Sequence, residues 1–157
     1  GLAASGIEPG ELAGEPRQAV RLQGDPVLAG VAGFLEGVLS AGASVTLAGG
    51  TQLLAAAALV RHAGIETALE LATTSYVATD PTASVESTAD ALALSLSTTD
   101  PGFGDGDHDG LQRFAAGEGK EGAGMGGALT LATRQGIARQ AVRDRTATLY
   151  DRLLEGH

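Results

Sequence analysis

Residues 44–53 read Ser-Val-Thr-Leu-Ala-Gly-Gly-Thr-Gln-Leu, and this stretch decides the expected fold. The short apolar, β-branched run at 44–48 predicts a buried strand, and the alanine- and leucine-rich residues 52–62 predict a helix that ends at Gly64. A strand that enters a helix through a di-glycine turn is typical of proteins in which strands and helices alternate.

The same alternation continues on both sides of this stretch. Asp25 and Pro26 predict a helix start with Asp25 as N-cap, and apolar residues at helical spacing continue to Gly42. The other expected elements are a strand within 65–77, a helical turn capped by Ser87, a strand at 92–96, helical turns at 112–116, and a helix over 128–154 with a break at Gly136. We therefore expect an α/β protein: a layered, Rossmann-like fold with a mostly parallel sheet and glycine-rich loops at the strand ends, where ligands bind.

The chain has 157 residues, the length of one ordinary domain. We expect residues 25–157 to form a single α/β domain. Residues 1–24 are rich in Gly, Pro and Glu without periodicity, which indicates a linker or surface segment. The sequence begins at Gly1 without an initiator Met and reads as the C-terminal part of something longer; no signal peptide opens it, and we expect a cytoplasmic protein.

Composition excludes several classes of function. Nineteen acidic and ten basic residues give a net charge of −9, which argues against a nucleic-acid partner. The absence of cysteine excludes disulfides, thiolate catalysis and cysteine-based metal sites. The apolar run from Val27 to Gly50 contains Glu36 and several glycines, so a buried helix and strand are expected there rather than a membrane span.

The first candidate site is the turn Gly49-Gly50-Thr51-Gln52. Free backbone N–H groups at a helix N-terminus suit a phosphate or carboxylate, and the two glycines would let an anion approach. The alternative is a plain turn between strand and helix, with Thr51 as the N-cap.

The second candidate is the glycine-rich segment 117–127. Its start matches G-x-G-x-x-G, but a helix rather than a strand is expected before it and no acidic residue follows at the required distance, so a dinucleotide site is not expected. Its glycines would let the backbone wrap a ligand while Glu118, Lys120 and Glu121 point at it. The alternative is a flexible surface loop.

The third candidate is the acidic loop Asp105-Gly-Asp-His-Asp-Gly110. It begins like a calcium-binding loop, but the acid that such a loop requires would fall at Ala116. His108 has no second histidine nearby to complete a zinc site. We interpret the segment as a solvated acidic loop and expect no metal site.

An ordered series of motifs points to a family. The motifs are Gly24-Asp25-Pro26, then Leu-Ala-Gly-Gly-Thr-Gln-Leu at 47–53, then Thr73-Thr74 ahead of Val77 and Asp80, then Lys-Glu-Gly-Ala-Gly-Met-Gly-Gly at 120–127. In that order they resemble nicotinate-nucleotide–dimethylbenzimidazole phosphoribosyltransferases, and the closer likeness is to the branch of archaea and cyanobacteria, whose motifs read like AGGTQM and KEGVGAGG. The resemblance runs from about Gly24 to the end of the chain.

The resemblance implies an enzyme, a pentosyltransferase without a cofactor. It would move phosphoribose from nicotinate mononucleotide to 5,6-dimethylbenzimidazole, giving α-ribazole phosphate for the lower ligand of cobalamin. In the related motif GEGSGAAL the glutamate is the general base, and matching this motif to the sequence places that role on Glu121. A second way to align the motif would place it on Glu118. The resemblance also implies a homo-oligomer, possibly a dimer.

Residues for binding the substrates follow from the same motifs. The expected contacts come from Gly49, Gly50, Thr51, Gln52, Gly122 and Gly124. We infer in addition that Lys120 or Arg113 meets the phosphate or carboxylate of the nucleotide.

The chain also departs from the family pattern. An upstream segment with a Gly-Gly-Thr-Thr-Thr motif is absent, Leu53 replaces a methionine, and Ser75-Tyr76 stands where Arg-Trp is expected. Two other functions therefore stay open. One is a catalytically inactive module that binds a nucleotide or a benzimidazole, and the other is an assembly domain whose glycine-lined helix face serves self-association.

Overall fold

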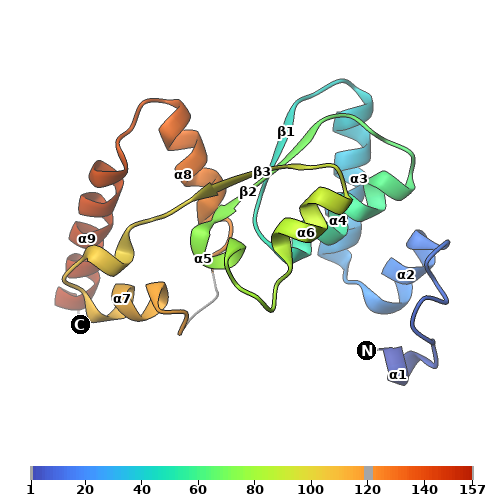
Figure 1. The fold of residues 1–157 in the computed structure, drawn as a ribbon, viewed down its shortest axis with the longest axis horizontal. Helices are drawn as coiled ribbons and strands as arrows, with labels where there is room; N and C mark the ends of the chain where they lie inside the picture. Colours follow the sequence, from blue (N-terminus) through green and yellow to red (C-terminus); the bar gives the residue numbers. More distant parts are fainter. Residues whose placement is uncertain (1, 119–121, 157) are drawn as a thin grey trace.

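The computed structural model describes residues 2–118 and 122–156, and strands and helices alternate through its centre (Figure 1). The elements in chain order are α1 (Leu2–Ser5), α2 (Pro16–Gln23), α3 (Pro26–Ser40), β1 (Val45–Ala48), α4 (Thr51–His62), β2 (Leu69–Thr74), α5 (Ser75–Ala78), α6 (Val85–Ala91), β3 (Ser95–Thr99), the 3-10 turn η1 (Phe103–Asp105), α7 (Asp109–Ala115), α8 (Met125–Arg134) and α9 (Arg139–Glu155).

The three strands form one parallel sheet in the order β1-β2-β3. Val45 pairs with Leu69 at the start of the sheet, and Thr74 pairs with Thr99 at its end. Parallel neighbours need a crossover, which α4 provides between β1 and β2, and α5 with α6 between β2 and β3. The α/β class with a parallel sheet, expected from the sequence, is confirmed.

The main core lies between the sheet and the helices α3, α4 and α6, on the right in Figure 1. Alternate residues of β2 point into it, as the buried Leu69 and Leu71 show. Its side chains are aliphatic: Leu35, Leu39, Leu47, Leu54, Ala56, Ala57, Val60, Leu69, Leu71, Val85, Ala89 and Leu94. A core built from such small residues explains how a chain with few aromatic residues folds.

Helix α8 covers the carboxyl ends of the strands from the opposite face. Two glycines make this contact possible, because a Cβ added at Gly126 would overlap the backbone of Thr73 and one added at Gly127 would overlap the Cβ of Ala48. Part of the glycine-rich segment 117–127 therefore serves close packing of a helix on the sheet rather than loop flexibility.

Two boundaries expected from the sequence are confirmed. Asp25 is the N-cap of α3, and its Oδ1 accepts a hydrogen bond from the Leu28 N–H at 2.8 Å. The break at Gly136 separates α8 from α9, and Gly136 has a positive φ of 77° that favours glycine.

Three other boundaries were wrong. The strand expected at 92–96 begins at Ser95, because Leu92 is the C-cap of α6 and Ala93 turns the chain with a φ of 52°. The helix expected to be capped by Ser87 begins three residues earlier, with Ser84 as its N-cap. Helix α8 begins inside the glycine-rich segment, at Met125, and not after it.

The part of segment 1–24 that the structure describes contains α1 and α2, and no residue of α2 is buried. Within the described ranges, none of the helices has the length and apolar character that crossing a bilayer requires.

Candidate functional site

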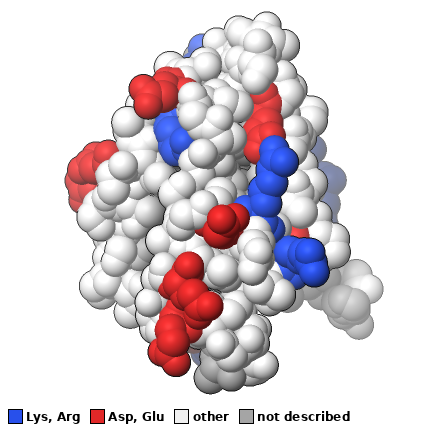
Figure 2. Space-filling view, turned by 90° about the vertical axis from the view of Figure 1, so that its right-hand side faces the viewer, with Lys and Arg blue, Asp and Glu red and all other residues white. Residues whose placement is uncertain are grey.

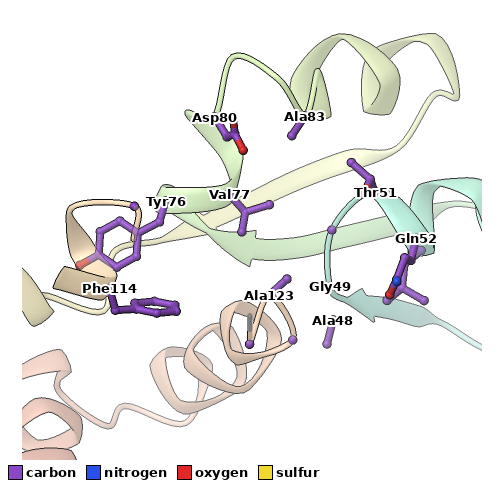
Figure 3. A pocket seen from close by; sticks show the side chains of 15 residues that line it. Ala48, Gly49, Thr51, Gln52, Tyr76, Val77, Asp80, Ala83, Phe114 and Ala123 are labelled. Atoms are coloured by element: carbon purple, nitrogen blue, oxygen red, sulfur yellow. The ribbon is translucent and has the colours of Figure 1, made fainter. Parts of the chain in front are cut away.

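A pocket of about 570 Å³ opens at the carboxyl ends of β1 and β2 (Figure 3). Pockets for small ligands commonly have a volume of ~300–1,000 Å³. Four parts of the chain line it: Ala48–Leu53 at the β1–α4 connection, Tyr76–Val77 with Asp80 and Ala83 around α5, Phe114 with Gly117 at the end of α7, and Gly122–Gly124 before α8. The pocket lies where parallel sheets place ligands.

The N-terminus of α4 forms one end of this pocket. Gly50 is the N-cap and no side chain caps the helix, so Thr51 is the first helical residue and not the N-cap that the alternative of a plain turn gave it. In the part of the chain that the structure describes, the N–H groups of Gly50, Thr51 and Gln52 have no hydrogen-bond acceptor. These free donors and the positive end of the helix dipole favour an anionic group at this end.

The glycines of this turn lie close to the side chains around them. A Cβ at Gly49 would lie 2.6 Å from Cδ1 of Leu53, and one at Gly50 would lie 3.3 Å from Cγ1 of Val77. On the other wall, a Cβ at Gly124 would lie 3.3 Å from the carbonyl oxygen of Ala48. The two glycine-containing segments thus approach each other closely across the pocket.

The other end of the pocket carries aromatic rings. Tyr76 and Phe114 meet edge to face, with ring centroids 5.8 Å apart. The hydroxyl of Tyr76 accepts a hydrogen bond from the Phe103 N–H at 3.2 Å. Burial raises the pKa of the Tyr76 phenol above its ordinary value, so this end stays uncharged at neutral pH.

A carboxylate lies on the rim between these two ends. Oδ1 of Asp80 accepts hydrogen bonds from the backbone N–H of Thr82 at 2.9 Å and from its hydroxyl at 2.7 Å. These bonds hold the side chain of Asp80 toward the pocket, as Figure 3 shows. The sequence indicated only a turn at Asp80-Pro81.

The structure brings together six of the residues expected to bind substrate. They are Gly49, Gly50, Thr51, Gln52, Gly122 and Gly124, and all six line the pocket although two separate motifs supply them. Glu121, the expected general base, and Lys120 lie outside the described residues.

Glu118 and Arg113 pair with each other instead of lining the pocket. Their Oε2 and Nε atoms are 4.0 Å apart, and both side chains are exposed. Neither belongs to the described lining of the pocket. An exposed ion pair of this length contributes little to stability.

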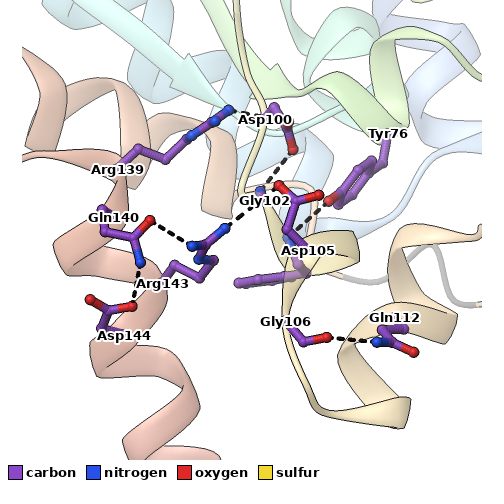
Figure 4. Close-up of polar contacts among 11 residues, drawn as sticks. Tyr76, Asp100, Gly102, Asp105, Gly106, Gln112, Arg139, Gln140, Arg143 and Asp144 are labelled. Carbon is purple, nitrogen blue, oxygen red and sulfur yellow. Dashed lines mark hydrogen bonds and ion pairs between the residues drawn. The ribbon is translucent and has the colours of Figure 1, made fainter.

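The acidic loop at 105–110 packs against α9 (Figure 4). Arg143 pairs with Asp105 at 3.5 Å, and Nε2 of His108 lies 3.5 Å from a carboxylate oxygen of Asp151. Over residues 2–118 and 122–156, no group of three or more His, Asp or Glu side chains could hold a metal ion.

Sequence reasoning missed the aromatic end of the pocket. Tyr76 entered only as a departure from a family motif, and Phe114 only as part of a short helix. A signal was present: the chain has five aromatic residues, and Tyr76, Phe103 and Phe114 form one cluster. Their spacing along the chain gives no sign that they meet.

Outside the described lining of the pocket, hydrogen-bonded polar side chains connect the three strands. Glu70, in the middle strand, accepts hydrogen bonds from the hydroxyls of Thr46 and Ser97, each at 2.6 Å, and from Nη2 of Arg134 at 2.5 Å. These bonds lower the pKa of Glu70, those from the hydroxyls of Ser97 and Thr46 most, and the Arg134 guanidinium adds to the effect. This carboxylate links all three strands to α8.

Similar proteins exist among curated sequences, although no family model matches the chain. A UPF0284 protein of Halobacterium salinarum is 52% identical over 153 residues, which are 97% of this chain and 46% of that protein. A UPF0284 protein of Methanosarcina mazei is 39% identical over 159 residues, covering 100% of this chain and 46% of the relative. The chain resembles UPF0284 proteins. It spans about half the length of these relatives, and their name states no reaction or ligand.

Proposed function

We propose that this chain carries the substrate pocket of a phosphoribosyltransferase. The reaction would move phosphoribose from nicotinate mononucleotide to 5,6-dimethylbenzimidazole and give α-ribazole phosphate. One observation supports it most: the two motifs of the family resemblance, 47–53 and the described end of 120–127, line the same pocket. The chain spans about half the length of its UPF0284 relatives, so this activity is proposed for the protein of which the pocket is part.

In this reaction one bond between ribose and a nitrogen atom is replaced by another. The bond between C1′ and the pyridine nitrogen of nicotinate breaks, its electron pair stays on that nitrogen, and neutral pyridine leaves without an acid. One nitrogen of the benzimidazole forms the new bond to C1′, and the other nitrogen loses its proton. We assign the acceptance of this proton to the carboxylate of Glu121, a role for which general-base catalysis contributes ~10²–10⁴-fold.

The described residues supply binding groups for the nucleotide. Its anionic group would lie at the N-terminus of α4, against the free N–H groups of Gly50, Thr51 and Gln52. The amide of Gln52 and the hydroxyl of Thr51, both exposed at this end, add donors. Gly122 and Gly124 would let the backbone before α8 close over the ligand.

The assay is separation of the reaction products by chromatography. The protein that contains this chain is incubated with nicotinate mononucleotide and 5,6-dimethylbenzimidazole, and free nicotinate and α-ribazole phosphate are measured. We expect Glu121→Gln to lower turnover by about 100-fold or more with little change in nucleotide affinity, because a base acts on the transfer step. Glu118→Gln is the matched variant, and a larger loss there would move the role to Glu118.

The alternative is a module that binds a nucleotide or benzimidazole without transfer. The departures from the family motifs at Leu53 and Ser75-Tyr76 favour it. Titration calorimetry with each substrate separates the two proposals: binding without product supports the module, and product supports the transferase. Absence of both would contradict both.

The proposal includes partners and location. We propose small-molecule partners in the cytoplasm and no nucleic acid, since the net charge is −9 and the face in Figure 2 carries acidic groups in several places as well as basic ones. We also propose a homodimer through the outward face of α3. Phe34 and Val27 are exposed there, and the space above Gly30 and Gly37 is open. A second copy offers the same uncharged face, whereas its other surfaces share the repelling negative charge.

A further inference from the structure

The three clustered aromatic rings stand apart from the way the rest of this chain is built. The main core is made of Leu, Val and Ala, so packing alone does not call for aromatic side chains. Tyr76, Phe103 and Phe114 nevertheless come from three separate segments and meet at one end of the pocket. Such a concentration beside a cavity points to a ligand that rings recognise.

Two layers are present in this cluster. Phe103 is buried, and its ring meets that of Phe114 edge to face with centroids 6.2 Å apart. Tyr76 and Phe114 lie in front of it, are only half-buried, and line the pocket. Phe103 therefore supports the wall, and the other two rings form its surface.

The hydroxyl of Tyr76 is not offered to the pocket. It accepts the hydrogen bond from the Phe103 N–H, and Figure 3 shows the oxygen pointing away from Ala123 and the interior. Thr74 fixes the turn that carries the ring, since its side chain accepts a hydrogen bond from the Val77 N–H at 3.4 Å. What Tyr76 presents to a ligand is its ring.

The geometry of the two rings sets the shape of the partner. Their planes meet at 73°, so a flat group that stacks on one ring turns its edge toward the face of the other. Val77 and Ala123 add apolar surface beside them. At the far end, Thr51 and Gln52 present polar groups (Figure 3). The pocket thus has an apolar aromatic end and a polar end.

We propose that Tyr76 and Phe114 form the binding wall for a planar aromatic base, and that these two side chains set the preference for a fused bicyclic base over a single ring. This inference rests on the proposed function for the identity of the base, a benzimidazole, but the wall itself is argued from the cluster. A fused bicycle has a larger flat area than a single ring. More of its apolar surface therefore leaves water when it stacks on the two side chains, and its binding free energy is more favourable.

Direct binding tests the wall without turnover. The affinity of the folded chain is measured by calorimetry for 5,6-dimethylbenzimidazole, benzimidazole and nicotinate. We expect dimethylbenzimidazole to bind more tightly than nicotinate, and Tyr76→Leu and Phe114→Leu each to weaken it by about tenfold, the size typical of a lost base–aromatic stack. Upfield shifts of the Tyr76 ring protons on saturation would report stacking itself.

Two variants separate the ring from other effects. Tyr76→Phe should restore the affinity lost in Tyr76→Leu to within about threefold, because the hydroxyl is engaged by Phe103 and not by the ligand. Tyr150→Leu is the matched control, since Tyr150 packs on His108 outside the described lining of the pocket and its removal should leave affinity unchanged. Circular dichroism checks that each variant is folded.

The binding results distinguish an error in the proposed aromatic wall from an error in the proposed reaction. Folded Tyr76→Leu and Phe114→Leu chains that bind the base as the unchanged chain does would overturn the wall, as would a chain that binds none of the three probes. A Tyr76→Phe variant as weak as Tyr76→Leu would also overturn it, because the hydroxyl would then be the recognising group. Ring-dependent binding without any product would sustain the wall and contradict the transferase.

Discussion

Single glycines decide whether the pocket can form. At Gly126 and Gly127 the backbone of α8 lies so close to β1 and β2 that no side chain fits between them. This contact places the residues before α8, Gly122 to Gly124, opposite the turn at Gly49 and Gly50. The glycines of the second motif thus have a packing role that is independent of any ligand.

Gly126→Ala should destabilise the fold. The added methyl group meets the backbone of Thr73, which cannot move aside as a flexible side chain can, so we expect a loss of about 1–3 kcal/mol in the free energy of unfolding. The measurement is urea denaturation followed by circular dichroism. Gly14→Ala, in open space at the surface, is the matched control and should change stability by less than about 0.5 kcal/mol.

At the scale of elements, the sheet is held by side chains as well as by its backbone ladder. Glu70 connects β1, β3 and α8 through one carboxylate, and the lowered pKa shows that its charged form is the one stabilised. Helix α9 has no buried residue and is attached by polar contacts (Figure 4). These include Arg139 with Asp100 at 3.2 Å.

Glu70→Gln should lower stability in a pH-dependent way. Because the folded-state pKa of Glu70 is below its ordinary value of 4.5, its contribution is complete above that value and is lost as the pH falls through the folded pKa. We expect a deficit of about 1–3 kcal/mol at pH 7 that shrinks as the pH falls below about 4.5. Urea denaturation of both proteins across this range measures it, and a deficit that grows on acidification would contradict this role of the carboxylate.

At the scale of the whole molecule, α3 is apolar on both sides. Leu35 and Leu39 face the core, while Val27 and Phe34 are exposed on the outer side. Apolar side chains on two sides of a helix favour packing on both of those sides. Self-association would cover this outer face.

Phe34→Asp should therefore shift the protein from dimer to monomer. A carboxylate at the centre of a twofold contact faces its own copy, and the two charges repel. Sedimentation velocity over a range of concentrations gives the outcome. Leu153→Asp in α9 is the matched control, because both original side chains are 68% exposed. An unchanged chain that stays monomeric at every concentration would contradict the dimer. Loss of the dimer with Leu153→Asp alone would place the contact on α9.

The sequence by itself determined the α/β class, the start of α3 at Asp25 and the turn at Gly49-Gly50, because capping, periodicity and turn chemistry act between residues that are close along the chain. It misplaced the start of β3, since the alternating Leu92-Ala93-Leu94 pattern fits a helix end as well as a strand. Only the tertiary structure brought Phe114 to Tyr76 and placed both across from Thr51. Those contacts join residues that are far apart along the chain, a long-range fit that no local pattern encodes.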